Sequence, residues 1–356
     1  MLRKVKSVLS VLLVSTMVLA MTACGSGKTA SSSEAAASEA APAASQDTAA
    51  ASAAASTASS KKIVIGFSQC TLASPFYVAI MDAAKAEAKA KGADFIYADA
   101  QNGVQKQNAD IQDMISKGVN VLLVNPVQSS GVQPAMDAAK GKSIPVVAVD
   151  RNIQAGYTSF VGRDNKAMGK LAGEKAVELL GGAGKAKGKI LEVQGAAGDQ
   201  VMMDRRDGFH SAVDKEPGIK VVQTAYCDYE RSKAVTASQD AFQANKDIAL
   251  IYAHNDDMAL GALQVATQRG LKDVKVVGVD GLMEAVKQIA SGGNYQATAL
   301  NDPAYEGKLA VDTALDILAG KTVEKYVDSK TGLVDTNNAK DYVNDSLTFA
   351  ALKDVQ

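Results

Sequence analysis

Short runs of β-branched residues alternate with helical stretches along most of this chain, and this alternation restricts the possible folds more than any other feature. In the first half the runs lie at residues 63–67, 95–97, 121–124 and 146–149. The stretch after the first run opens at Ser74-Pro75 and closes at Gly92, which is typical of a helix with proline in its first turn. Apolar strands separated by helices form a parallel sheet covered on both faces. The sequence therefore predicts an α/β fold.

The same order of elements begins again in the second half. Strands are expected at residues 189–193, 221–225, 250–253 and 274–279, with helices near 200–214, 231–243 and 257–269. A chain of 356 residues that is 47% hydrophobic is long enough for two domains. We therefore expect two doubly wound parallel-sheet domains that face one another. Ligands bind such sheets beyond the carboxyl ends of the strands, so function should lie in the residues that follow each strand.

The first 60 residues do not share this alternation. Three basic residues within the first six precede an apolar run at 8–21, which is too short for a membrane span and is typical of a secretion signal. The run ends in Met21-Thr22-Ala23-Cys24, which resembles the lipobox of bacterial lipoproteins. This resemblance implies that residues 1–23 are removed and that the thiol of Cys24 is acylated. The alternative is an ordinary signal peptide with a chance cysteine.

A segment without large apolar side chains follows the cysteine. Residues 25–60 are nearly all Ala, Ser, Thr, Gly and Glu, so they cannot bury enough surface to offset the entropy of ordering. We interpret residues 24–60 as the lipidated cysteine and a flexible tether. A coil of this length spans roughly 30–36 Å.

Polar side chains gather at the ends of the expected strands. Asp150-Arg151 and Asp280-Gly281 each follow a strand, and Arg205, Tyr229 and Asn255 lie shortly after others. Carboxylates, guanidinium groups and an amide that converge with aromatic rings suit a polyhydroxylated ring. Taken singly, residues such as Ser74, Asp228 and Asp280 could equally be helix caps or turns.

Composition and motifs exclude several other functions. The formal net charge of −1 does not indicate a surface that binds nucleic acid. With two His and three Cys, the chain has few side chains that could form a zinc site. We expect neither a metal nor a cofactor. Gly141-Lys142-Ser143 mimics the end of a P-loop, but Met136 stands where the leading glycine would be. Cys70 and Cys227 are expected to be free thiols in different domains.

Several motifs occur in the order and spacing of a known family: Ser74-Pro75-Phe76-Tyr77, Val149-Asp150-Arg151, Asp204-Arg205, Asp228-Tyr229-Glu230-Arg231, Asn255-Asp256-Asp257-Met258 and Val277-Gly278-Val279-Asp280-Gly281. From about residue 61 onward the chain resembles the ribose-type substrate-binding proteins of bacterial ABC transporters, and it is also similar to the galactofuranose-binding branch. The resemblance implies two α/β domains, 61–163 with 302–333 and 164–301 with 334–356. Three crossing segments would join them as a hinge that closes on the ligand.

The family's binding residues carry over position by position. Its aromatic clamp falls on Phe76, Tyr77 and Tyr229. Its polar contacts fall on Asp150, Arg151, Arg205, Asn255, Asp280 and Asn301. The chain differs from the ribose binders at the rim of the site, where Cys70, Ser74 and Asn301 replace Ser, Asn and Gln. The ligand can therefore be ribose, a hexose or another aldose.

The resemblance implies a monomeric, non-enzymatic protein that hands a monosaccharide to an ABC permease. It would be anchored through Cys24 outside the cytoplasm, on the outer face of the cytoplasmic membrane or in a periplasm. A sensor that feeds a chemoreceptor or kinase is the alternative. A sugar-sensing transcription regulator would need a helix-turn-helix where the signal and tether stand. In a hydrolase Asp150 and Asp280 could form the acid and base, but neighbouring arginines should keep both ionised.

Overall fold

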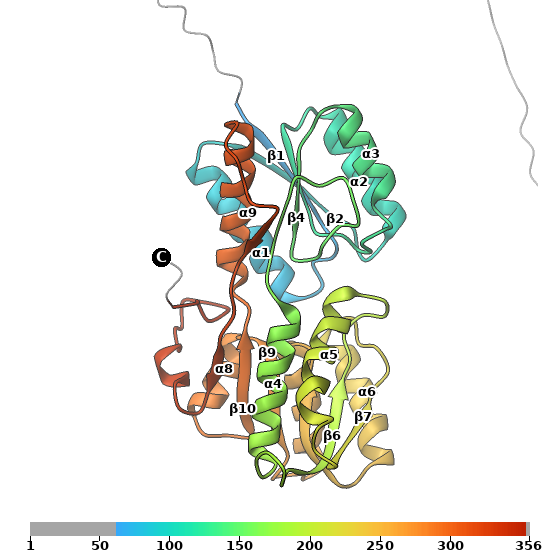
Figure 1. Cartoon of the computed structure of the whole chain (residues 1–356), viewed down its shortest axis with the longest axis vertical. Coiled ribbons are helices and arrows are strands. Elements are labelled where there is room, and N and C mark those ends of the chain that lie inside the picture. The colour runs from blue at the N-terminus through green and yellow to red at the C-terminus, as the bar shows by residue number, and fades with distance from the viewer. Residues whose placement is uncertain (1–61, 354–356) are drawn as a thin grey trace, which may run out of the picture. The chain divides into compact units, whose positions relative to one another are not determined.

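The computed structural model describes residues 62–353, which form two α/β lobes (Figure 1). The expected signal at 1–23, the lipidation site Cys24 and the rest of the tether lie outside the described residues. Between residues 62 and 353 no helix combines the length and apolar character that a membrane crossing requires.

The first lobe is built on a six-stranded, fully parallel sheet. In spatial order its strands are β11 (Tyr326–Asp328), β5 (Ser159–Gly162), β4 (Val146–Val149), β3 (Val121–Val124), β1 (Val64–Gln69) and β2 (Asp94–Asp99). Its helices are α1 (Pro75–Ala90), α2 (Val104–Ser116), α3 (Gln133–Gly141) and α9 (Pro303–Leu318). Helix α1 packs on α9 and α2 packs on α3. All residues of β3 and β4 are buried, as a strand covered on both faces requires.

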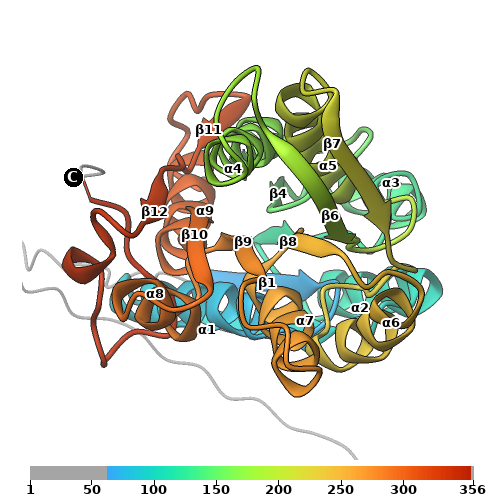
Figure 2. The same ribbon diagram turned by 90° about the horizontal axis from the view of Figure 1, so that it is seen from below.

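The second lobe repeats this plan with an added antiparallel edge. Its strands are, in spatial order, β12 (Leu333–Asp335), β10 (Tyr295–Leu300), β9 (Lys275–Asp280), β8 (Ile248–Ala253), β6 (Lys187–Val193) and β7 (Gly218–Gln223), and only β12 is antiparallel to its neighbour. Its helices are α4 (Asn165–Leu179), α5 (Gln200–Val213), α6 (Arg231–Ala244), α7 (Asp256–Gln268) and α8 (Met283–Ala290), and a short 3-10 helix follows at Ala339–Asp341. Figure 2 shows helices around both sheets.

The chain crosses between the lobes three times: between β5 and α4, between β10 and α9, and between β11 and β12 (Figure 1). The expected fold class, two doubly wound lobes joined by a three-segment hinge, is therefore confirmed. The strand expected at 221–225 instead runs from Gly218 to Gln223. Strands β5, β10, β11 and β12 were not predicted.

Glycines set the closest helix contact of the second lobe. Helices α4 and α5 approach so closely that a Cβ on Gly169 would lie 2.0 Å from the carbonyl oxygen of Arg205, and one on Gly208 would lie 2.0 Å from that of Lys166. Real side chains do not tolerate such distances. This packing therefore fixes where α5 places Arg205.

Candidate functional site

A small pocket lies between the two lobes at the carboxyl ends of their strands. Five residues from each lobe line it: Ser74, Phe76, Tyr77, Asp150 and Arg163 from the first, and Val201, Arg205, Tyr229, Asn255 and Asp280 from the second. Its volume of about 10 Å³ is close to what one water molecule needs, so a larger ligand enters only if the lobes or these side chains move apart. The structure thus brings eight of the eleven predicted site residues together and adds Arg163 and Val201.

Three aromatic rings form most of the apolar part of this pocket, together with Val201. Proline at the start of α1 fixes the first turn, from which Phe76 and Tyr77 project with ring centroids 5.8 Å apart. Tyr229 comes from the other lobe and donates a hydrogen bond to Asp199 at 2.6 Å. A Cβ on Gly195 would lie 2.5 Å from the Tyr229 ring, so glycine at this position makes room for the ring.

Two carboxylates sit on strained backbone at the strand ends. Asp150 and Asp280 have φ values of 63° and 121°, a region that L-residues rarely adopt and that clusters at functional sites. One oxygen of Asp150 accepts from Arg163, and the other accepts from Asn125 at 3.1 Å. Asp280 lies 3.5 Å from the guanidinium of Arg205. Both carboxylates are therefore held in place before any ligand arrives.

Burial affects the pKa of Asp280 more than its arginine neighbour does. Burial raises its pKa to about 6, although Arg205 acts in the opposite direction. The arginine therefore does not hold the pKa in its usual range, because desolvation outweighs the nearby positive charge. The group remains mostly ionised at pH 7 and can accept hydrogen bonds from hydroxyl groups.

The hydrogen bonds that orient Arg205 leave part of its guanidinium group available to a ligand. Its Nε donates to Asn165 at 3.0 Å and one terminal nitrogen donates to the carbonyl of His254 at 2.5 Å.

Two further lining residues stand at the N-termini of helices. Asn255 accepts from the backbone N–H of Met258 at 3.0 Å, so it caps α7 as well as lining the pocket. Ser74 stands at the N-cap position of α1 but makes no capping bond. Its hydroxyl remains available for another partner.

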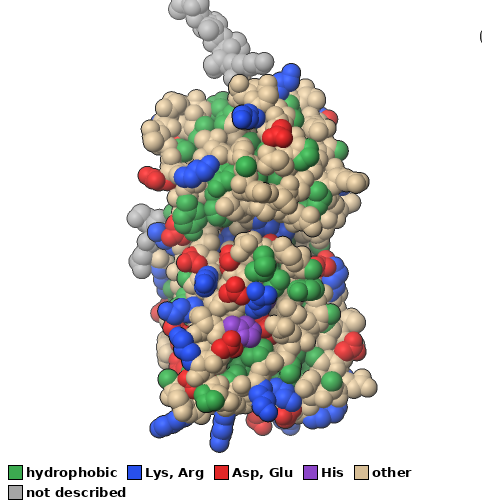
Figure 3. Space-filling view, turned by 45° about the vertical axis from the view of Figure 1, so that its right-hand side comes forward, with side chains coloured by type: hydrophobic (Ala, Val, Ile, Leu, Met, Phe, Trp, Pro, Cys, Tyr) green, Lys and Arg blue, Asp and Glu red, His purple; other side chains and the backbone are tan. Residues whose placement is uncertain are grey.

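Arg151 lies between this pocket and a wider cleft. The cleft has a volume of about 700 Å³ and is lined by both lobes and by Arg151; Figure 3 shows the folded part narrowed where the lobes meet. Arg151 donates to the Tyr77 hydroxyl at 2.5 Å and lies 3.7 Å from Asp199 of the opposite lobe. Its guanidinium carbon is 5.7 Å from the centre of the Tyr229 ring. These contacts bridge the lobes on the solvent side of the pocket.

Besides Arg151, two other predicted residues lie outside the pocket lining. Asn301 donates to Asp280 at 3.2 Å, so it contacts a lining residue without lining the pocket itself. Cys70 is fully buried and contacts Gln69, and burial raises the pKa of its thiol to about 12. Cys70 and Cys227 are both free, as expected.

Sequence reasoning missed Arg163. It follows β5, a strand of only four residues, and its one signal was its place directly after Gly162 at a strand end.

Buried polar atoms without a hydrogen-bond partner concentrate around this pocket. Among residues 62–353 there are seven such side-chain atoms, and six belong to residues that line the pocket or bond directly to its lining: Ser74 Oγ, Asn125 Oδ1, Arg151 Nε, Arg163 Nε, Asn301 Oδ1 and Glu306 Oε1. Burying a polar group without a partner costs about 1–3 kcal/mol each. These unpartnered atoms therefore indicate that the pocket binds a polar ligand, which would complete their hydrogen bonds.

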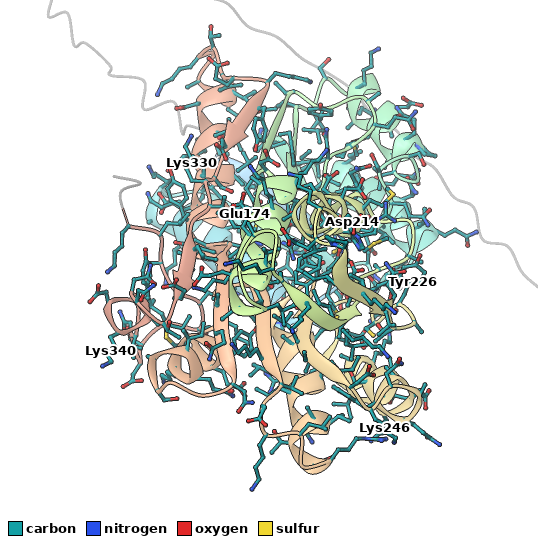
Figure 4. The ribbon with its side chains drawn as sticks, turned by 60° about the horizontal axis from the view of Figure 1, so that its bottom comes forward. Glu174, Asp214, Tyr226, Lys246, Lys330 and Lys340 are labelled. Carbon is teal, nitrogen blue, oxygen red and sulfur yellow. The ribbon has the colours of Figure 1, made fainter. Side chains whose placement is uncertain are left out.

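A network of histidines and a glutamate supports the second lobe behind the pocket. Glu192 is fully buried and lies 2.8 Å from Nε2 of His254 and 3.0 Å from Nε2 of His210. His254 is buried and does not face solvent. His210 also lies 2.9 Å from Asp214, which is labelled in Figure 4. The two carboxylates stabilise the charged imidazole of His210.

This network predicts a loss of stability at alkaline pH. The bond to Glu192 raises the pKa of His210 from 6.5 to about 9, so the stabilisation is complete below pH 6.5 and disappears as the pH rises through 9. We expect the free energy of unfolding of the natural chain to exceed that of His210→Gln by about 1–3 kcal/mol at pH 6, and by much less at pH 10. Urea unfolding at both pH values measures this difference. A difference that does not change with pH would contradict the assignment.

The described residues contain no cluster of three or more His, Cys, Asp or Glu side chains that could hold a metal ion.

Comparisons with known proteins agree with this architecture. A family model described as "Periplasmic binding protein domain" matches residues 65–322. The ribose import binding protein of Bacillus subtilis is 37% identical over 269 residues, which is 75% of this chain and 85% of that protein. The galactofuranose-binding protein of Escherichia coli is 32% identical over 240 residues, 65% of this chain and 74% of that protein.

A solved structure is more similar in sequence. An ABC transporter solute binding protein from Mycobacterium smegmatis, crystallised with glycerol, is 55% identical with a TM-score of 0.79, and the match covers 82% of this chain and 100% of that chain.

Proposed function

The chain belongs to the family of periplasmic binding protein domains, and from that premise we propose that it captures a monosaccharide, ribose or a related aldose, between its two lobes. The loaded protein then delivers the sugar to the permease of an ABC transporter, outside the cytoplasm and as a monomer. The chain itself performs no chemistry on the sugar. Relatives that bind ribose and galactofuranose support this sugar class.

One observation carries the proposal: the six unpartnered polar atoms around the pocket include both donors and acceptors. A hydroxyl group is neutral and both donates and accepts a hydrogen bond. A ligand with several hydroxyls can therefore accept from Nε of Arg163 and bond the hydroxyl of Ser74, the two unpartnered atoms that belong to lining residues. The rings of Phe76, Tyr77 and Tyr229 would pack against its C–H faces.

A thermal-shift screen tests this function. The folded chain is heated with D-ribose, L-arabinose, D-galactose or D-allose, and a sugar that binds only the native state raises the melting temperature by mass action. We expect at least one aldose to do so, and chromatography should recover it unchanged after incubation. If no aldose shifts the transition at millimolar concentration, the proposed function is wrong.

Binding should be coupled to closure of the hinge. We propose that the hinge joins the parts 61–163 with 302–333 and 164–301 with 334–356, because the pocket takes residues from both lobes. A ligand that touches both lobes binds the closed form better, and only such a difference shifts the population.

We expect small-angle X-ray scattering to give a smaller radius of gyration with saturating sugar than without it. The forward scattering reports in the same experiment whether the protein is a monomer. A sugar that leaves the melting temperature unchanged is the control. Identical scattering curves with and without the bound aldose would contradict the hinge mechanism.

Acylation of Cys24 should hold the protein at the membrane, which accounts for the motif at Met21–Cys24. A single acyl chain anchors weakly, and stable attachment needs at least a second one. We expect Cys24→Ala to move the protein from the membrane fraction to the soluble extracytoplasmic fraction. A matched Ser26→Ala variant should stay with the membrane. If Cys24→Ala also stays there, the anchor assignment is wrong.

A further inference from the structure

Arg163 stands where the pocket meets the hinge. It comes directly after β5 on the first crossing segment, and its partner Glu306 lies in the first turn of α9, after the second crossing. Both side chains are almost completely buried, with 1% and 0% of their surface exposed. Arg163 also lines the pocket, and its guanidinium carbon lies 5.2 Å from the centre of the Phe76 ring.

The hydrogen bonds of Arg163 are incomplete. One terminal nitrogen donates to Glu306 at 2.6 Å, and the other donates to Asp150. Nε carries a further N–H, and no described residue accepts it although the atom is buried. A buried charged donor without an acceptor is costly. Since this side chain belongs to the pocket lining, an oxygen of the bound molecule can supply the missing acceptor.

We propose that Arg163 binds the ligand through its Nε, and that Glu306 positions it; this rests on the proposed function. Asp150 accepts from Arg163 and also lines the pocket, so one sugar hydroxyl can accept from Arg163 and donate to Asp150. A site built around such a hydroxyl strongly rejects an analogue that lacks it, because its buried polar groups are then left unpaired. Arg163 is thus a specificity-determining residue of the pocket.

The test separates ligand contact from a purely structural ion pair. Arg163→Met alone would leave the buried Glu306 without its partner and could prevent folding. The double variant Arg163→Met/Glu306→Gln removes this ion pair, and Asp150, which also loses Arg163, keeps Asn125 and, at 3.9 Å, Arg151 as partners, so we expect the variant to fold; its melting temperature verifies this. Calorimetry then measures its affinity for the aldose that stabilises the natural chain. We expect a loss of at least tenfold; unchanged affinity would overturn the proposal.

Deoxy analogues identify the contact directly. Each monodeoxy form of that aldose is titrated into the natural chain and into the double variant. We expect one form to bind the natural chain at least a hundredfold more weakly than the parent sugar. In the double variant, the difference in affinity between this form and the parent sugar should be much smaller. If every penalty is the same in both proteins, Arg163 does not touch the ligand. If the natural chain binds no aldose, the proposed function fails first and this assignment falls with it.

Discussion

Replacing Arg205 with alanine is expected to weaken sugar binding at least thirtyfold. Arg205 is buried between Asn165, the carbonyl of His254 and Asp280, and it lines the pocket. Removing a partner from a closed, water-poor site leaves other groups unpaired, which costs about 2–5 kcal/mol. Asp150→Ala removes an acceptor in the same pocket and should cost a similar amount.

The neighbouring residue supplies a matched control. Arg206 is partly exposed and pairs with Asp207 on the surface of α5, so Arg206→Ala should bind the sugar as the natural chain does. Isothermal titration calorimetry with the aldose found in the thermal screen measures all three variants. Natural affinity in both Arg205→Ala and Asp150→Ala would show that the sugar binds elsewhere.

The second large effect concerns stability. A Cβ on Gly208 would lie 2.0 Å from the carbonyl oxygen of Lys166, which is backbone and cannot rotate away. Gly208→Ala must therefore push α5 away from α4, and overpacking of this kind typically costs 1–3 kcal/mol or more. Because Arg205 lies one turn earlier on α5, we expect weaker sugar binding as well.

Another helical glycine tests whether contact, rather than glycine itself, is responsible. Gly141 ends α3, and a Cβ there would meet no atom within 4 Å. Gly141→Ala should leave the free energy of unfolding unchanged or raise it slightly, since alanine favours a helix. Urea unfolding compares the two variants. Equal stability of Gly208→Ala and the natural chain would mean that α4 and α5 do not pack as described.

Local patterns predicted the buried strands but not the hinge elements. The runs at 121–124 and 146–149 coincide with β3 and β4, because a strand covered on both faces must be continuously apolar. Strand β5 is only four residues long with Ser and Gly at its ends, and β10 contains Gln296 and Thr298. Long-range pairing, which no local pattern encodes, makes these segments strands.

The same reason limits prediction of the site. Residues that follow clear strands or open clear helices, such as Asp150, Asp280 and Phe76, do lie in the pocket. Arg163 follows a strand that periodicity could not detect, so its place at a strand end could not be recognised from the sequence. Arg151, which we also expect to contact the sugar, bridges Tyr77 and Asp199 at the cleft, a position that depends on how the lobes approach one another.

The return of the chain to the first lobe also constrains the order in which the protein folds. Helix α9 covers α1 so closely that a Cβ on Gly307 would lie 2.4 Å from the carbonyl oxygen of Ile80. During synthesis α1 must therefore wait for more than two hundred residues, including helices α4 to α8 of the second lobe, before its partner emerges. Until then the side of α1 that α9 will cover has no partner. A product that ends before Pro303 keeps this apolar surface exposed, which favours aggregation and degradation over folding.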